Sequence, residues 1–345
     1  MDKTGQRRTN RDTSKNERFF SFYLQKISRL KAIFQARKQD RKQDRKQENK
    51  IEIKQSFNLS RLQYGNKESY MAGLIESNKQ IYQPIMNESN MENKKTPLYV
   101  AFSTQKGGVG KTTFTVLAAS YLYYLKGYDV AVVDCDYPQH SIAGMRKRDA
   151  EQVGADEDYK RMAYEQFTRL GKKAYPVLCS SPEKAIATAD EYIAAGHVPD
   201  IVFFDLPGTV NSEGVINSLA GMDYIFTPIS ADKVVLESSL SFAMAIQKLL
   251  VKNEACRLAG LYLFWNMVDG REKTDLYTAY DKTIKELELP LMKTFIPDTK
   301  RYKKELVADK KAVFRSTLFP ASRPLVRGSN LEELITEITY YIKLQ

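Results

Sequence analysis

A glycine-rich loop with two lysines offers the clearest chemistry in this sequence. The loop follows an apolar stretch and contains Lys106, Gly107, Gly108, Val109, Gly110, Lys111, Thr112 and Thr113. Glycines let successive backbone amides point at one anion, and a helix that begins near Thr112 adds its positive dipole end. Lys111 is suited to neutralise the β- and γ-phosphates of a nucleotide, and the Thr112 hydroxyl to ligate Mg²⁺. The loop therefore predicts an ATPase that uses ATP and Mg²⁺.

Two apolar stretches further along the chain each deliver carboxylates. One ends in Asp134 and Asp136, and the other, residues 200–208, carries Asp205 and Gly208 at its end. Carboxylates at the carboxyl ends of parallel strands, beside a phosphate loop, can hold Mg²⁺ or orient an attacking water. We expect Asp205 to reach Mg²⁺ through water.

These side chains require a sheet whose strands all end at one edge. From Pro97 onward, short apolar runs alternate with helical stretches, which is typical of an α/β fold with a mostly parallel twisted sheet and helices on both faces. We predict a P-loop NTPase domain over residues 96–345. The strands are expected at residues 98–103, 130–134, 174–179, 201–205, 224–228, 258–265 and 291–296. The last helix, 330–344, is expected to open with a capping box of Asn330 and Glu333.

Residues 1–95 differ in kind from the rest. Residues 1–50 hold 16 Lys/Arg and 6 Asp/Glu, which leaves 37 and 36 for the remaining chain, so the net charge of +11 is concentrated at this end. An amphipathic basic stretch at 20–34 precedes a four-residue charged repeat at 37–48. We predict a basic N-terminal extension, partly helical or disordered, that contacts a membrane surface, nucleic acid or a partner helix, or binds nothing.

Composition indicates in which cellular compartment the protein works and whether it spans a membrane. The three cysteines form no CxxC pair and no secretion-like leader is recognised, so we expect a cytoplasmic protein. No continuous apolar run approaches the roughly 18 residues that a membrane span needs.

The lysine at position 106 carries a resemblance to a known family. The pattern xKGGxGK[ST], with Gln105 where the ordinary motif has its first glycine, resembles the deviant Walker A motif of the ParA/MinD ATPases. This resemblance extends over residues 97–345. It implies an ATP-sandwich homodimer in which Lys106 acts on the partner's nucleotide, as an arginine finger does elsewhere.

Other positions acquire roles through the same resemblance. Asp136 would position the attacking water and Asp134 would support the metal shell. Asn266 and Pro297 match the base-binding positions, although either can equally be a turn residue. The chain looks most similar to ParA-like TraA proteins of conjugative transposons, while its D-x-D-x-x-Q spacing is closer to MipZ.

The resemblance leaves two main functions open. The first is a partition, maintenance or transfer ATPase that binds DNA non-specifically in the ATP state and is stimulated by a ParB-like or other protein; it would associate with the nucleoid. Nine Lys/Arg against two acidic residues between 300 and 327 favour it, with Lys300, Arg301, Lys303 and Lys304 as expected DNA contacts. The alternative is a MinD/MipZ-like spatial regulator at a membrane or on a division or secretion apparatus. An iron-protein role is disfavoured because residues 206–221 lack cysteine.

Overall fold

The computed structural model describes residues 96–208, 213–253, 256–271, 274–306 and 312–344. The chain divides into two compact units, one of residues 68–271 with 289–345 and one of residues 1–67 with 272–288. The described part of the second unit contains helix α10 (Thr274–Glu286). The predicted N-terminal extension, residues 1–95, lies outside the described residues.

The first unit is built on a six-stranded parallel sheet, which confirms the predicted fold class. The strand order is β3-β2-β4-β1-β5-β6, so the first strand lies inside the sheet between β4 and β5. Because all strands run the same way, the loops after β1, β2, β4 and β6 leave from one edge. The strands are β1 (Leu98–Phe102), β2 (Val130–Asp134), β3 (Val177–Cys179), β4 (Ile201–Asp205), β5 (Tyr224–Ile229) and β6 (Gly260–Trp265).

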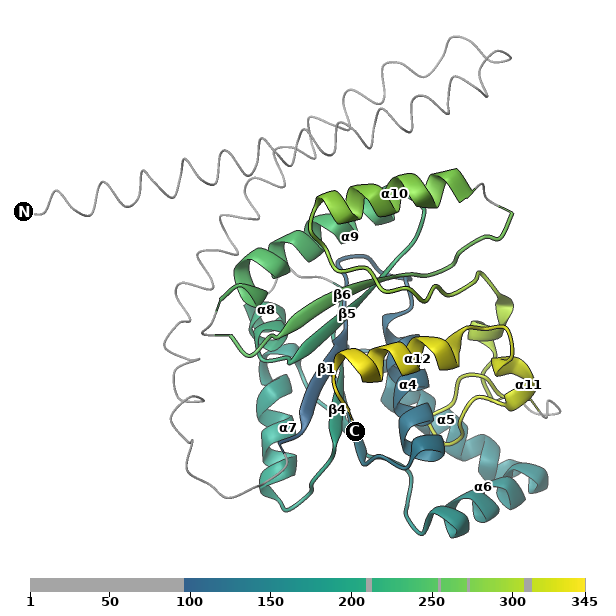
Figure 1. Ribbon diagram of the computed structural model, residues 1–345. Helices are drawn as coiled ribbons and strands as arrows, with labels where there is room; N and C mark the ends of the chain where they lie inside the picture. Colours follow the sequence, from purple (N-terminus) through teal and green to yellow (C-terminus); the bar gives the residue numbers. More distant parts are fainter. Residues whose placement is uncertain (1–95, 209–212, 254–255, 272–273, 307–311, 345) are drawn as a thin grey trace, which may run out of the picture. The chain divides into compact units, whose positions relative to one another are not determined.

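Helices cover both faces of this sheet, with α7, α8 and α9 on one face and α4, α5 and α12 on the other (Figure 1). The α-helices of this unit are α4 (Lys111–Tyr121), α5 (Ser141–Ala155), α6 (Glu157–Leu170), α7 (Ala185–Ala194), α8 (Glu213–Ala220), α9 (Lys233–Ile246), α11 (Arg323–Val326) and α12 (Leu331–Tyr341). Shorter turns are the π-helices η2 (Leu122–Lys126) and η4 (Gln247–Val251) and the 3-10 helices η3 (Pro182–Lys184) and η5 (Lys300–Lys303).

An aromatic cluster fills the core between β1 and α4. Phe102, fully buried at the end of β1, lies within 6.3 Å, centroid to centroid, of four other phenylalanine rings. One of them, Phe114, belongs to α4 and makes an edge contact with Phe264 of β6 at 5.0 Å. Buried aromatic surface therefore fixes the helix that follows the glycine-rich loop against the centre of the sheet.

The strand predicted at residues 291–296 is wrong. This stretch forms only isolated bridges, Leu263 with Leu291 and Val268 with Pro297. Between the bridges, the amides of Lys293 and Thr294 donate to the carboxylate of Glu337 on α12, each at 2.8 Å. The amides of Met292 and Ile296 still donate to carbonyls of β6, so Glu337 interrupts the ladder between these two contacts.

The capping box predicted for the last helix is also wrong. Asn330 adopts a left-handed conformation (φ 58°), and its side-chain amide donates to the Phe295 carbonyl instead of capping the helix. The amide of Leu331 donates to the hydroxyl of Ser329 at 3.2 Å. One orphan amide of α12 is thus satisfied by a residue one position earlier than predicted.

Residues 233–251, which form α9 and η4, are long and apolar enough to cross a membrane by length and composition. The sequence prediction did not single them out because Glu237, Ser238 and Lys248 interrupt the apolar run. Half of the window is buried inside the domain. Core helices of soluble proteins commonly meet the same criterion, so it is weak evidence for a span.

Residues 312–322, here called the 312–322 segment, are held by side chains from other elements rather than by regular structure. The buried carboxylate of Asp149 on α5 accepts from the Ser316 hydroxyl and from the amide and hydroxyl of Thr317, at 2.7–3.1 Å. Arg146 donates to the Thr317 hydroxyl and carbonyl. Ser120 of α4 donates to the Ser316 carbonyl at 2.7 Å.

We predict that Asp149→Ala lowers the free energy of unfolding by about 3 kcal/mol, because it leaves buried donors without an acceptor. Chemical denaturation measures this change. The control is Asp158→Asn on α6, which removes one charge from an exposed ion pair with Arg161 and should cost less than about 1 kcal/mol. Equal effects of the two substitutions would contradict the role assigned to Asp149.

Candidate functional site

The glycine-rich loop joins β1 to α4, as predicted. Gly108 (φ 76°) and Gly110 (φ 99°) adopt backbone conformations that other residues rarely reach. A Cβ at Gly110 would lie 2.9 Å from the ring of Phe114 and 3.3 Å from the amide nitrogen of Asn266. Glycine at 110 therefore satisfies both the turn and the close approach of two neighbours.

Lys111 is the first residue of α4, and much of its side chain is buried. Burial lowers the pKa of its ammonium group, while the carboxylates of Asp205 and Asp136 oppose that shift. Its Nζ lies 3.4 Å from the carbonyl of Lys106. A cation held inside the loop with only weak internal hydrogen bonding suits a phosphate ligand.

Gly208 lies directly against this lysine. A Cβ built on Gly208 would stand 2.9 Å from Lys111 Nζ and 3.6 Å from the backbone nitrogen of Gly107. Gly208, three positions past the end of β4, thus lies close to the glycine-rich loop.

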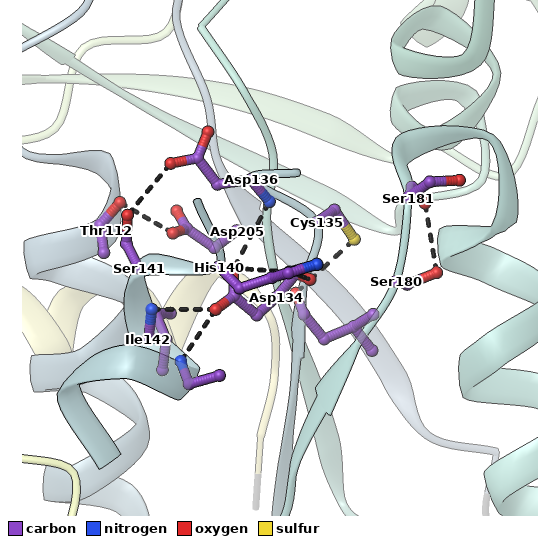
Figure 2. A network of polar contacts seen from close by, with 12 residues as sticks. Thr112, Asp134, Cys135, Asp136, His140, Ser141, Ile142, Ser180, Ser181 and Asp205 are labelled. Carbon is purple, nitrogen blue, oxygen red and sulfur yellow. Dashed lines mark hydrogen bonds and ion pairs between the residues drawn. The ribbon is translucent and has the colours of Figure 1, made fainter. Parts of the chain in front are cut away.

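Asp205 ends β4 beside the first turn of α4. Its Oδ2 accepts from the Thr112 hydroxyl at 2.7 Å, as Figure 2 shows. Its Oδ1 is buried and has no hydrogen-bond partner among the described residues. Burial raises the pKa of this carboxyl to about 7, and the Thr112 hydrogen bond opposes the shift.

These donors fit Mg²⁺. A buried carboxylate oxygen without a partner, next to a hydroxyl, is suited to a hard cation that prefers oxygen ligands. Within the described ranges, no three His, Cys, Asp or Glu side chains are grouped as a metal site. Mg²⁺ commonly takes one or two protein ligands and completes its shell with phosphate and water oxygens.

Asp134 ends β2, Asp136 follows two positions later, and both carboxylates lie at the start of α5 (Figure 2). Asp134 Oδ2 accepts from the amides of Ile142 and Ala143, both at 2.9 Å, at the start of α5. Burial raises its pKa and these amides oppose the change. Through these contacts Asp134 holds the start of α5. Its predicted place in the metal shell stays a prediction.

Asp136 is half-buried and less constrained. Its Oδ2 accepts from the Ser141 hydroxyl at 3.1 Å, and its backbone amide lies 3.4 Å from Asp134 Oδ1. Such a carboxylate is available to a water molecule, so its predicted role as the water-positioning residue is compatible with this geometry and stays a prediction.

The second lysine of the loop, Lys106, is half-buried, and its ammonium has no hydrogen-bond partner among the described residues. A lysine so close to the phosphate loop and without a local acceptor is free to meet an anion from outside its own chain. Its predicted action on a partner's nucleotide stays a prediction.

The two predicted base contacts lie on neighbouring stretches of backbone. Val268, two positions after Asn266, forms a bridge with Pro297. Asn266 Nδ2 donates to the Val109 carbonyl and its Oδ1 accepts from the Met267 amide, both at 2.9 Å. The Asn266 amide nitrogen has a second hydrogen, and its carbonyl oxygen has a second lone pair. Asn266 can therefore hold the loop and still contact a base.

The basic stretch separates into two kinds of residue. Lys300, Lys303 and Lys304 are exposed around η5. Arg301 is partly buried, and its Nη1 donates to the carbonyls of Leu325 and Arg327. Three of the four predicted DNA contacts thus face solvent, while the fourth is engaged in holding the chain.

Arg315 was counted with this basic stretch, and the structure turns it inward. Its Nη1 donates to the Thr113 hydroxyl at 2.6 Å, and its Nη2 bonds Glu305. No sequence signal could have found it, because 202 residues separate it from Thr113. Arg315 is therefore a member of the loop's surroundings that the sequence did not indicate.

Comparisons with known proteins agree with this geometry. A family model described as the CobQ/CobB/MinD/ParA nucleotide binding domain matches residues 100–311. The chromosome-partitioning ATPase Soj of Thermus thermophilus is 27% identical over 183 residues, which cover 50% of this chain and 70% of Soj.

Two solved structures are similar over most of their length. The Pyrococcus furiosus cell division ATPase MinD has a TM-score of 0.46 and 16% identity, covering 71% of this chain and all of MinD. Cobyrinic acid a,c-diamide synthase from Mycobacterium smegmatis, with bound ATP analogue and magnesium, has a TM-score of 0.44 and 18% identity, covering 71% and 96%.

We predict that Gly208→Ala weakens binding of a fluorescent ATP analogue by about threefold, because the added methyl group forces the Lys111 ammonium to shift. Gly154→Ala, on α5 where nothing lies within 4 Å of the added Cβ, serves as the control and should bind like the wild type. Unchanged affinity in Gly208→Ala would show that the contact with Lys111 is irrelevant to the nucleotide.

Proposed function

Because the chain belongs to the CobQ/CobB/MinD/ParA nucleotide-binding family, we propose that it is an ATPase switch of ParA type, acting in the partition, maintenance or transfer of a mobile element. In this role it binds Mg²⁺-ATP, dimerises, binds DNA without regard to sequence, and releases the DNA after ATP hydrolysis. One observation carries the nucleotide part: the buried carboxylate of Asp205 accepts from Thr112 through Oδ2, and its Oδ1 has no hydrogen-bond partner among the described residues.

The proposed nucleotide site divides its work among three elements. The loop amides, Lys111 and the Thr113 hydroxyl bind the phosphates, while Thr112 and Asp205 hold Mg²⁺, with Asp134 supporting the shell. When bound there, Mg²⁺ would supply positive charge to offset the charge that develops on the phosphate oxygens. Asp136 orients the attacking water, since its carboxylate is half-buried and held by only one side-chain hydrogen bond in the structure.

Dimerisation is proposed from Lys106. A cation that has no acceptor among the described residues of its own chain, at the mouth of a phosphate loop, can stabilise charge on the nucleotide of a second copy. Each of the two sites would then need both chains. Association would thereby depend on the bound triphosphate, which makes ATP the switch.

DNA binding is proposed from the exposed ammonium groups of Lys300, Lys303 and Lys304. Contacts of this kind go to phosphates and carry no sequence information. Two chains in a dimer double the number of contacts, so the ATP-bound dimer holds DNA more tightly than the monomer. We expect the protein in the cytoplasm, on the nucleoid while ATP is bound, and released when a ParB-like partner stimulates hydrolysis.

The chosen experiment measures retention of the full chain on non-specific duplex DNA against salt, with ATP, with ADP and without nucleotide. We predict retention with ATP that declines steeply as salt rises. Lys111→Ala should lose the dependence on nucleotide, and Asp136→Ala should keep the bound state by blocking hydrolysis. Equal retention under all three nucleotide conditions would refute the switch.

Two charge-reversed variants separate the basic segment from general electrostatics. Lys300→Glu with Lys303→Glu is expected to abolish retention while ATP binding persists. Lys160→Glu with Arg161→Glu on α6 changes the charge equally on another exposed surface and should retain most DNA binding. ATP-dependent sedimentation with phosphatidylglycerol vesicles, without DNA retention, would instead favour the MinD/MipZ-like regulator.

The shared site predicts complementation between two inactive variants. Lys106→Ala lacks the lysine it gives to its partner, and Asp136→Ala lacks its own water-positioning carboxylate. In a mixed dimer, the site of the first chain receives Lys106 from the second and is complete. An equal mixture should therefore recover about a quarter of wild-type ATP hydrolysis, since about half of the dimers are mixed and each has one intact site.

Formation of mixed dimers is checked by a tag on one chain. If such dimers form and ATP hydrolysis stays at the level of the separate variants, Lys106 does not act across the interface. Lys126→Ala mixed with Asp136→Ala is the control for a lysine outside the site, and there the Lys126→Ala sites should remain active on their own.

A further inference from the structure

We propose that Arg315 is a positioning residue of the nucleotide site that acts through the hydroxyl of Thr113. The inference rests on the proposed function, in that it needs ATP to bind at the glycine-rich loop. It adds to that function an arginine from the 312–322 segment, far from the loop in sequence and outside the motifs that identify the family.

The first observation is the direction of the hydrogen bond between the two residues. Arg315 Nη1 donates to Thr113 Oγ1 at 2.6 Å. Guanidinium has only donors, so the hydroxyl must accept here, and its own hydrogen is left for another acceptor. Thr113 lies in the first turn of α4, where the backbone amides of the loop converge on the phosphates. The arginine therefore leaves the threonine as a donor toward a phosphate oxygen.

The second observation is the local charge. Arg315 Nη2 bonds Glu305 Oε1, and Arg148 Nη2 lies 3.5 Å from the other oxygen of the same carboxylate. Two arginines thus share one carboxylate, which leaves one positive charge uncompensated within this group. Arg315 Nε is buried and has no partner among the described residues. An anion close to Thr113 would compensate that charge.

The third observation is that Arg315 is fixed in place. Its backbone amide donates to the Lys304 carbonyl at 2.9 Å. The next two residues, Ser316 and Thr317, are tied to Asp149 on α5. An arginine held at both its backbone amide and its guanidinium loses little conformational entropy when the nucleotide binds. This favours a positioning role over a chance surface contact.

The test is a double-mutant cycle in the full chain, with affinity for a fluorescent ATP analogue measured at saturating Mg²⁺. Arg315→Ala should weaken binding by about tenfold, as expected for loss of one charge-assisted contact. Thr113→Val, which keeps the shape and removes the hydroxyl, should weaken it by at least as much. In the Thr113→Val background, Arg315→Ala should have a much smaller effect, because the hydroxyl is gone and only the unscreened part of the arginine's charge still reaches the nucleotide.

Arg146→Ala is the matched control, since Arg146 also holds the 312–322 segment, through Thr317, but has no bond to Thr113. It should change the melting temperature and leave the affinity for the analogue near the wild-type value. If Arg146→Ala weakens binding as strongly as Arg315→Ala, the effect comes from loosening the segment and the inference is overturned.

Additive losses in the cycle, or wild-type affinity in Arg315→Ala, would overturn the inference as well. Should Arg315→Ala fail to fold, Arg315→Gln removes the charge at smaller cost in packing, and wild-type affinity in that variant would have the same meaning. Failure of the proposed function looks different: the wild-type chain itself would not bind the analogue, and Lys111→Ala would change nothing.

Discussion

The buried carboxylate of Asp205 is the interaction on which the rest of the site depends. A carboxylate in the interior is costly unless it is paired, and here one oxygen has only the Thr112 hydroxyl while the other has no partner among the described residues. Burial accordingly raises the pKa of Asp205 to about 7. The strand that carries it pairs in register with β1 and β2, so the Asp205 carboxylate lies where the sheet, the glycine-rich loop and α4 meet. A bound cation would compensate the negative charge of this carboxylate.

The sequence indicated those parts of the site that depend on neighbours in the chain. The bounds of β2 and β4 matched the prediction because each is a short apolar run that ends in aspartate, and the loop was defined by the glycines that its turn requires. The grouping of these residues followed from one rule, that parallel strands end at the same edge. The described residues bear out this arrangement, whereas the individual roles in catalysis remain to be tested.

What escaped prediction depends on contacts between distant parts of the chain. Residues 291–296 were predicted as a strand, but two of their amides donate to Glu337. Asn330 was predicted as a helix cap, but its side-chain amide donates to the Phe295 carbonyl. Arg315 looked like one more solvated basic residue near Lys304. In each case a partner distant in the sequence, either a side chain or a backbone carbonyl, decided the outcome, and composition or spacing carries no record of such a partner.

The 312–322 segment shows where this dependence leads. Its described residues form neither a helix nor a strand, and they are held by Ser120 of α4, Tyr124 of η2, Arg146 and Asp149 of α5, and Gln166 of α6. The conformation of this stretch of backbone therefore depends on side chains of four other elements. Transplanting the segment alone into a related chain would transfer its sequence without its conformation, because the side chains that hold it would stay behind.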